Sequence, residues 1–213
     1  MEPFVITIGR QLGAGGRAIG HFLAKEFDMD YYDKEILAIA AKESGYSEDI
    51  FEKNDEKKGF FGHAFRSVIP MIGTGEYYNN SISEEALFRL QSDAILKAAN
   101  AHSSVFIGRV ADYVLRNNPR CINIFLTANY EDRISRVMER RNVDRKVARR
   151  LLEKGESQRA EFYNFYSSRT WGEADTYHLC LNTSILGIEK SGEMVYDKRV
   201  RIPNRRCSRW TFV

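Results

Sequence analysis

A glycine-dense segment near the N-terminus has the residue types that bind phosphate. Residues 4–8 form a short apolar run rich in β-branched side chains, which is typical of a buried strand. The segment GRQLGAGGR follows, and apolar residues then recur with a helical period from Ile19 to Phe27. A strand, a glycine loop and a helix in this order present backbone N–H groups to an anion. The alternative is a glycine-rich turn that enters an α/β domain and binds no ligand.

The loop departs from the common phosphate-loop pattern G-x-x-x-x-G-K-[ST]. With Gly15 on the second glycine, Arg10 takes the first glycine position, Gly16 the lysine position and Arg17 the Ser/Thr position. The lysine that would reach the β- and γ-phosphates is therefore absent. Arg10 or Arg17 is expected to supply the missing charge, although the planar guanidinium approaches a phosphate with a different geometry.

Two further polar side chains follow predicted strands. Asp33 comes directly after Tyr31-Tyr32, which has the character of a very short strand. Open parallel sheets bind ligands at the carboxyl ends of their strands, although a plain N-cap role for Asp33 is an alternative. Arg109 comes after Gly108 at the end of an apolar run, where a guanidinium suits bidentate recognition of a phosphate or a base.

Residues 133–160 are dense in arginine, with eight arginines against two lysines. The arginines are Arg133, Arg136, Arg140, Arg141, Arg145, Arg149, Arg150 and Arg159. Arginine favours planar, multidentate contacts with anions more than lysine does. The alternative is a solvated helical face paired with acidic residues at helical spacings. We expect most of these arginines to face solvent and two or three to bind an anion.

The predicted elements bring these residues to one edge of a sheet. Strands are predicted near residues 4–8, 31–32, 104–107, 121–126 and 177–182, with helices between them. This order predicts an α/β fold of three layers, with a five-stranded parallel sheet covered by helices on both faces. Residues 44–80 are expected to form a mobile, mostly helical insert whose aromatic side chains line a base pocket, pack in a small core or form a dimer contact.

Composition limits the classes of function. The chain has 213 residues, which suits one α/β domain with an insert. Without a long apolar run or a signal peptide, we expect a cytoplasmic protein with no membrane partner. Three widely spaced cysteines indicate a reducing compartment, and no histidine or cysteine spacing predicts a metal bound by the protein itself.

The positive charge is concentrated at the C-terminus. Residues 190–213 contain seven basic and two acidic residues and so carry a net charge of +5. Because the net charge of the whole chain is +3, residues 1–189 carry −2. The body is therefore not expected to bind nucleic acid. Gly192 interrupts the segment where a final helix would fall, and residues 190–213 are expected to be a disordered basic tail or foreign sequence outside a domain of residues 1–189.

Together these motifs resemble the cytidylate kinase-like family of P-loop nucleoside monophosphate kinases. The matching segments are IGRQLGAGGRAIG (8–20), YYDKEIL (31–37), VFIGRVADYVL (105–115), IFLTA (124–128), ESQRAEFY (156–163) and LNTSILGIE (181–189). The resemblance covers residues 4–189 and is to a divergent branch with a GxGGR phosphate loop. It implies a P-loop kinase fold with a helical acceptor-binding insert at residues 44–80 and a short lid at about residues 140–160.

The resemblance also implies an activity and a set of site residues. The activity is transfer of the γ-phosphoryl group of ATP to a nucleoside monophosphate, CMP or dCMP first, with Mg²⁺ carried on the ATP. The resemblance implies that the ATP phosphates are bound by Arg10, Gly13, Ala14, Gly15, Gly16, Arg17 and Ala18, and that the residues acting in transfer are Arg17, Arg140 and Arg159. It also implies that the acceptor is bound by Asp33, Arg109 and Asp112, and that the residues near the adenine are Asn182, Thr183 and Ser184. ATP and a nucleoside monophosphate are the implied partners, and a homo-oligomer is left open.

The missing loop lysine leaves two other functions open. One is a nucleotide-binding regulatory pseudokinase without transfer activity, and the other is a kinase for a different small acceptor. Loss of a cation that stabilises the transition state costs a few kcal/mol unless another residue replaces it.

Overall fold

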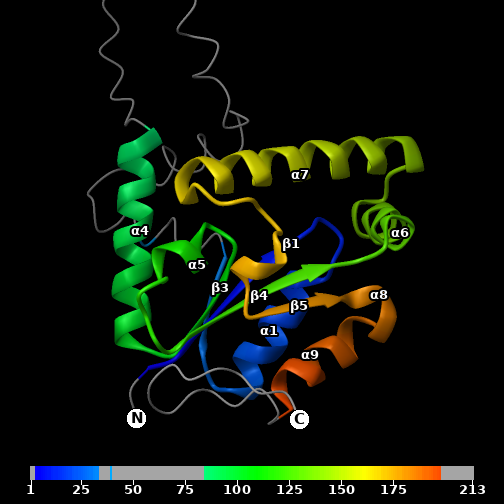
Figure 1. Ribbon diagram of the computed structural model, residues 1–213. Helices are drawn as coiled ribbons and strands as arrows, with labels where there is room; N and C mark the ends of the chain where they lie inside the picture. The colour runs from blue at the N-terminus through cyan, green and yellow to red at the C-terminus, as the bar shows by residue number, and fades with distance from the viewer. Residues whose placement is uncertain (1–2, 34–38, 40–83, 198–213) are drawn as a thin grey trace, which may run out of the picture. The chain divides into compact units, whose positions relative to one another are not determined.

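The computed structural model describes residues 3–33, 39 and 84–197. The chain divides into two compact units, one of residues 1–33 with 96–213 and the other of residues 34–95. The first unit contains a five-stranded sheet in the order β2-β3-β1-β4-β5 (Figure 1). The strands are β1 (Val5–Arg10), β2 (Asp30–Tyr32), β3 (Ser104–Ile107), β4 (Cys121–Thr127) and β5 (Leu179–Asn182).

All strand pairs in this sheet are parallel, which confirms the predicted sheet. The central strand β1 pairs with β3 and β4, so that Thr7 lies beside Phe106 on one side and Asn123 on the other. Nearly every residue of β3 and β4 is buried, as expected for a parallel sheet that is covered on both faces. Continuous apolar runs therefore made these strands recognisable in the sequence.

The helices of the first unit cover both faces of this sheet. They are α1 (Gly16–Glu26), α5 (Ala111–Val114), α6 (Tyr130–Arg141), α7 (Arg145–Ser167), α8 (Thr183–Leu186) and α9 (Ile188–Tyr196), with a 3-10 turn at Ala174–Thr176. The β1-α1-β2 and β3-α5-β4 connections cross the sheet in opposite directions, so right-handed crossovers put α1 and α5 on opposite faces (Figure 1). The three-layer fold is thus confirmed.

The segment predicted to be a short lid, at about residues 140–160, comprises the end of α6 and most of α7, and its role as a lid stays a prediction. Residues 145–160 form the greater part of α7, which is one helix of 23 residues. Its first turn is capped by Asp144, whose carboxylate accepts a hydrogen bond from the backbone N–H of Val147 at 2.8 Å. This long helix brings Glu156 and Arg159 to the carboxyl end of the sheet.

Helix α9 corrects the expected end of the domain. Ser191, Gly192 and Val195 are buried in this helix, and α9 packs against α1. A Cβ added to Gly192 would lie 2.9 Å from Phe22 Cδ1, so the glycine permits close helix packing rather than interrupting a helix. The boundary after residue 189 was therefore wrong for residues 190–196, while residues 198–213 lie outside the described part of the chain.

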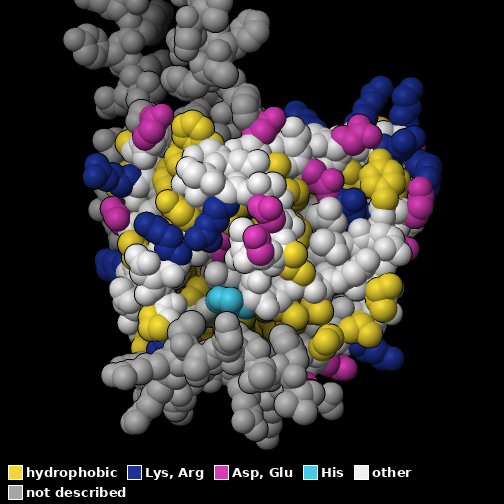
Figure 2. Space-filling model, viewed as in Figure 1, with side chains coloured by type: hydrophobic (Ala, Val, Ile, Leu, Met, Phe, Trp, Pro, Cys, Tyr) yellow, Lys and Arg dark blue, Asp and Glu magenta, His cyan; other side chains and the backbone are white. Residues whose placement is uncertain are grey.

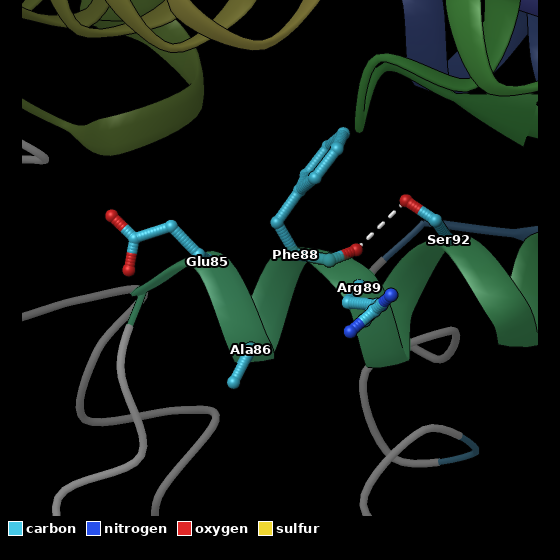
Figure 3. Close-up of a pocket in the computed structure, with 5 residues that line it drawn as sticks. All are labelled: Glu85, Ala86, Phe88, Arg89 and Ser92. Atoms are coloured by element: carbon cyan, nitrogen blue, oxygen red, sulfur yellow. Dashed lines mark hydrogen bonds between the residues drawn. The ribbon is translucent and has the colours of Figure 1, made fainter.

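Helix α4 (Glu84–Ala101) begins in the unit of residues 34–95. Five residues of its first three turns line a hollow of about 530 Å³, namely Glu85, Ala86, Phe88, Arg89 and Ser92 (Figure 3). The Ser92 hydroxyl donates to the Phe88 carbonyl oxygen at 2.7 Å and so bonds within the helix. The insert predicted for residues 44–80 lies outside the described residues. Among the helices that are described, none is both long and apolar enough to cross a membrane.

Candidate functional site

The glycine loop connects β1 to α1 and has the backbone shape of an anion cradle. Gly13 and Gly15 have φ values of 82° and 84°, in the left-handed region that glycine adopts without strain. A Cβ on Gly13 would lie 2.9 Å from the backbone of Arg133, so α6 also packs closely against the loop. Gly15 is the N-cap of α1, and no side chain of the described residues caps this helix. The first-turn N–H groups at Gly16, Arg17 and Ala18 are thus suited to bind an anion.

The side chains of Thr183, which is buried, and Arg136 form hydrogen bonds to backbone carbonyl oxygens of the glycine loop. Thr183 Oγ1 lies 3.1 Å from the Ala14 carbonyl oxygen and 3.2 Å from that of Thr127. Arg136 Nη1 donates to the Gly13 carbonyl oxygen at 3.1 Å and to Thr183 Oγ1 at 3.0 Å. These bonds tie the loop to the start of α8 and fix its shape before any ligand binds.

Asp33 lies at the carboxyl end of β2 and joins two arginines from other elements. Arg17 Nε, in the first turn of α1, donates to Asp33 Oδ2 at 2.6 Å. Arg10 Nη2, at the end of β1, lies 3.7 Å from Asp33 Oδ1. The Asp33 side chain is 7% exposed and that of Arg10 18%, whereas the Arg17 side chain is 44% exposed. The contact with Arg10 is therefore the more shielded of the two from solvent. The prediction that Asp33 lies at the ligand edge of the sheet agrees with this position.

Arg159 and Arg109 complete a cluster of four arginines, the arginine cluster, with Arg10 and Arg17. Arg159 Nη1, from α7, donates to the carbonyl oxygen of Arg10 at 3.3 Å. Burial, the Arg159 charge and, more weakly, Arg109 and Arg17 lower the pKa of Arg10 to about 9, against the opposing effect of Asp33. Burial likewise lowers the pKa of Arg159. Positive charge is thus in excess at the mouth of the glycine loop, which favours a bound anion.

The backbone after β3 is strained where it delivers Arg109. Gly108, Arg109 and Val110 have φ values of 68°, 59° and 57°, three left-handed residues in succession. A β-branched residue such as Val110 rarely adopts this conformation. The Gly108 N–H donates to the Ile8 carbonyl oxygen at 3.0 Å, which fixes the turn against β1. Strain of this kind is concentrated at functional sites, and here it places Arg109 close enough to influence Arg10.

Other arginines of residues 133–160 have structural or solvent-facing positions. Arg133 forms an ion pair with Glu156 between α6 and α7. Arg145 makes two hydrogen bonds to the Glu131 carboxylate, at 2.6 and 2.8 Å. Figure 2 shows basic and acidic side chains intermixed on the surface over the α6–α7 connection. The expectation that most of these arginines face solvent agrees with this arrangement, while anion binding by two or three of them stays a prediction.

Arg140 lies apart from the arginine cluster. It is exposed on the last turn of α6, whereas the charges that act most on the pKa of Arg10 are those of Arg159, Asp33, Arg109 and Arg17. Its role as a lid arginine stays a prediction.

Asp112 is buried rather than open to an acceptor. The Tyr163 hydroxyl donates to Asp112 Oδ2 at 2.7 Å, and burial raises the pKa of Asp112. The structure therefore gives this carboxyl group a partner on α7, and its role in acceptor binding stays a prediction.

The residues expected near the adenine form a cap at the end of β5. The Asn182 side chain accepts from the Ser184 N–H at 2.9 Å and donates to Asn129 Oδ1 at 3.0 Å. Ser184 Oγ accepts from the Asn129 N–H at 2.9 Å. The Thr183 side chain is fully buried, so its hydroxyl supports the glycine loop and has no exposed face for a base. For Asn182 and Ser184 the adenine role stays a prediction.

Two features of the site escaped the sequence reasoning. Arg136 was counted among the arginines without a role, yet it bonds to the loop 123 residues away. Thr183 was assigned to the adenine rather than to the loop. The excess of arginine over lysine was the available signal for Arg136, whereas nothing in the sequence specified which arginine reaches Gly13. Among the described residues there is no group of three His, Cys, Asp or Glu side chains suited to hold a metal ion.

Comparisons with known proteins agree with this architecture. The fold is similar to that of an uncharacterized protein from Eubacterium ventriosum ATCC 27560, with 26% sequence identity and a TM-score of 0.66 over 91% of this chain and 96% of that chain. Shikimate kinase from Bacteroides thetaiotaomicron is 13% identical, with a TM-score of 0.51 over 91% of this chain and 97% of that chain, and therefore shares the fold. No curated protein matches the chain.

A family model matches most of the chain. The model described as the cytidylate kinase-like family matches residues 5–185. This range contains the whole sheet, the glycine loop and the arginine cluster. A match over most of the domain, with the loop and the arginines inside it, leads to one assignment: the chain belongs to the cytidylate kinase-like family.

Proposed function

We propose that this protein transfers the γ-phosphoryl group of ATP to a nucleoside monophosphate, with CMP or dCMP as the first candidates. The observation that carries the proposal is the arginine cluster around Asp33 at the mouth of the glycine loop. Phosphoryl transfer requires positioning and neutralisation of the charge on the equatorial phosphate oxygens. An excess of guanidinium groups, most of them partly buried, beside a glycine loop suits that requirement.

The site divides naturally into two sides. The N–H groups of the glycine loop and of the first turn of α1 would hold the ATP phosphates from Gly13 to Ala18. Asp33 and Arg109, which follow β2 and β3, would face the acceptor nucleotide, with Asp33 also orienting Arg17 through the 2.6 Å hydrogen bond. Arg159 reaches the junction of the two sides from α7, where a guanidinium stabilises charge on the group in transfer.

The residues present fit a metal ion that is carried by the substrate. Arg17 stands at the loop position where a Ser or Thr hydroxyl commonly contacts Mg²⁺, and Asp33 is already bonded to Arg17. We therefore propose that Mg²⁺ binds through the phosphate oxygens of ATP and water, as this ion often does. Its chemistry there is to neutralise phosphate charge.

A panel of acceptors tests the activity. ADP formation from MgATP is measured with CMP, dCMP, UMP, AMP, GMP and dTMP, with shikimate as the acceptor of a fold relative, and without acceptor. Turnover with pyrimidine monophosphates supports the proposal. Turnover with shikimate alone would identify a kinase for another small acceptor, and ATP binding with no ADP from any acceptor would identify a nucleotide-binding pseudokinase.

Arg159 provides a test of the site. Arg159→Ala should lower kcat at least about 100-fold, the loss found when one donor that stabilises transition-state charge is removed. Arg150→Ala is the matched control, because Arg150 is exposed on the same helix. Equal rates for both variants and the wild type would contradict the assignment of Arg159.

A further inference from the structure

The Arg10 side chain lies in a slot that two glycines leave open. A Cβ on Gly16 would lie 2.8 Å from Arg10 Cγ and 3.1 Å from Arg10 Cβ. A Cβ on Gly108 would overlap Arg10 Nη1 and lie 3.0 Å from Arg10 Cζ. Glycine at position 16 thus makes room for the stem of Arg10, and glycine at position 108 makes room for its guanidinium group.

Position 16 is also where the common phosphate-loop pattern carries its lysine. A lysine there would begin at the Cβ that the Arg10 stem excludes. Gly16 is the first residue of α1 and does not have a left-handed φ value, so its backbone conformation accepts a side chain. The space taken by Arg10, rather than the backbone, therefore prevents a side chain at this position.

We infer that Arg10 and a lysine at position 16 are mutually exclusive occupants of one space, and that Arg10 is the cation that contacts the phosphates in place of that lysine. The inference rests on the proposed function for the identity of the anion, a nucleoside triphosphate. It assigns to a residue from the end of β1 a role that the usual pattern gives to the first turn of α1.

The surroundings of the Arg10 guanidinium agree with this role. Its side chain is 18% exposed, and Nη2 faces the ligand edge of the sheet 3.7 Å from Asp33 Oδ1. Arg159 fixes the backbone of Arg10 by donating to its carbonyl oxygen at 3.3 Å. Arg17 is the other candidate, but its side chain is 44% exposed and its Nε is bonded to Asp33 at 2.6 Å. Arg10 is therefore the more confined cation.

A reciprocal exchange tests the inference. Four variants are compared with the wild type, namely Arg10→Met, Gly16→Lys, the double variant Arg10→Ala/Gly16→Lys, and Arg150→Met as an exposed-arginine control. Calorimetry measures the binding of inorganic tripolyphosphate and of MgATP, and thermal unfolding reports whether each variant folds. Arg10→Met should weaken tripolyphosphate binding about 10- to 100-fold, the range expected for one hydrogen bond to a charged group.

The double variant is the decisive measurement. Gly16→Lys alone should weaken binding because the new stem collides with Arg10, whereas the double variant should bind within about fivefold of the wild type, since one cation has replaced another in the same space. Folded Arg10→Met that binds like the wild type, or a folded double variant no better than Arg10→Met, would overturn the inference. Tripolyphosphate binding that follows the expected pattern, with no acceptor phosphorylated, would sustain the inference while contradicting the proposed function.

Discussion

Arg10 keeps its positive charge in surroundings that disfavour it. Burial and the neighbouring Arg159 lower its pKa to about 9, while Asp33 acts in the opposite direction. A bound polyanion supplies the missing negative charge and therefore raises this pKa again. The proton on Arg10 and the anion are thus expected to bind together.

Binding of an anion should take up a proton at alkaline pH. Because the pKa of Arg10 is lowered, a larger fraction of the empty sites carries neutral Arg10 at pH 9 than at pH 7, and the anion restores the charged form. At pH 7 Arg10 is already charged and contributes no uptake. Calorimetric titration of tripolyphosphate at both pH values, in two buffers that differ in ionisation enthalpy, measures this difference.

The Arg10→Met variant supplies the control for proton uptake. At pH 9 its binding enthalpy should depend less on the buffer than that of the wild type, because only the proton uptake by Arg10 is removed. Equal proton uptake in this variant and the wild type would show that another group titrates.

Thr183 should matter for the stability of the loop more than for recognition of a base. Thr183→Val keeps the shape of the side chain but leaves the Ala14 and Thr127 carbonyl oxygens and Arg136 without its hydroxyl. We expect a loss of about 1–3 kcal/mol in the free energy of unfolding, the cost of unsatisfied buried polar groups. Urea unfolding measures it, and Thr183→Ser, which retains the hydroxyl, should lose less.

The sequence indicated the kinds of residue in the site but not their pairing. The glycine loop, Asp33 and Arg109 were predicted because each follows an apolar strand. Arg10 and Arg17 remained equivalent candidates for the missing charge, since the slot formed by Gly16 and Gly108 depends on residues about 90 positions apart in the chain. Such a contact is set by the sheet order and leaves no local spacing to recognise.

At the scale of elements, strands were more predictable than the last helix. The apolar runs of β1, β3 and β4 directly reflect burial on both faces of the sheet. Helix α9 was missed because Gly192 lowers helix propensity, while packing against α1 more than compensates. Propensity is a local quantity, and the partner helix lies at the other end of the sequence.

Gly192 should therefore be sensitive to any added side chain. Gly192→Val places a Cβ 2.9 Å from Phe22 Cδ1 and should lower the free energy of unfolding by about 1–3 kcal/mol, the usual cost of overpacking. Met194→Val introduces the same residue at a position that is 48% exposed and should have little effect. Chemical unfolding compares the two variants. Helix propensity favours valine over glycine but methionine over valine, so a Gly192→Val variant no less stable than Met194→Val would contradict the packing role of Gly192.

At the scale of the whole molecule, net charge is a poor guide to the site. Residues 1–189 carry a net charge of −2, yet the ligand edge of the sheet gathers Arg10, Arg17, Arg109 and Arg159 around Asp33. The local field, and not the overall balance, decides which ligand is attracted. Repulsion among these arginines should also destabilise the folded protein when no anion is bound.

Polyanions should accordingly stabilise the fold. Tripolyphosphate should raise the Tm in proportion to its binding, whereas sodium chloride at equal ionic strength should not, because screening acts weakly on partly buried charges. Arg17→Ala should reduce the increase in Tm, and Arg150→Ala should leave it unchanged. An equal rise with both salts would indicate a general ionic effect in place of a specific site.

The slot around Arg10 also bears on how such a sequence can change over generations. A single replacement of Gly16 by lysine would introduce a collision, and a single replacement of Arg10 would remove the cation, so each first step toward the common loop pattern is expected to weaken phosphate binding. A return requires both changes together, whereas Gly108 remains favoured in either form because its φ of 68° lies in the left-handed region. The arginine form of the loop is therefore entrenched, and descendants of this chain are expected to inherit positions 10 and 16 as a unit.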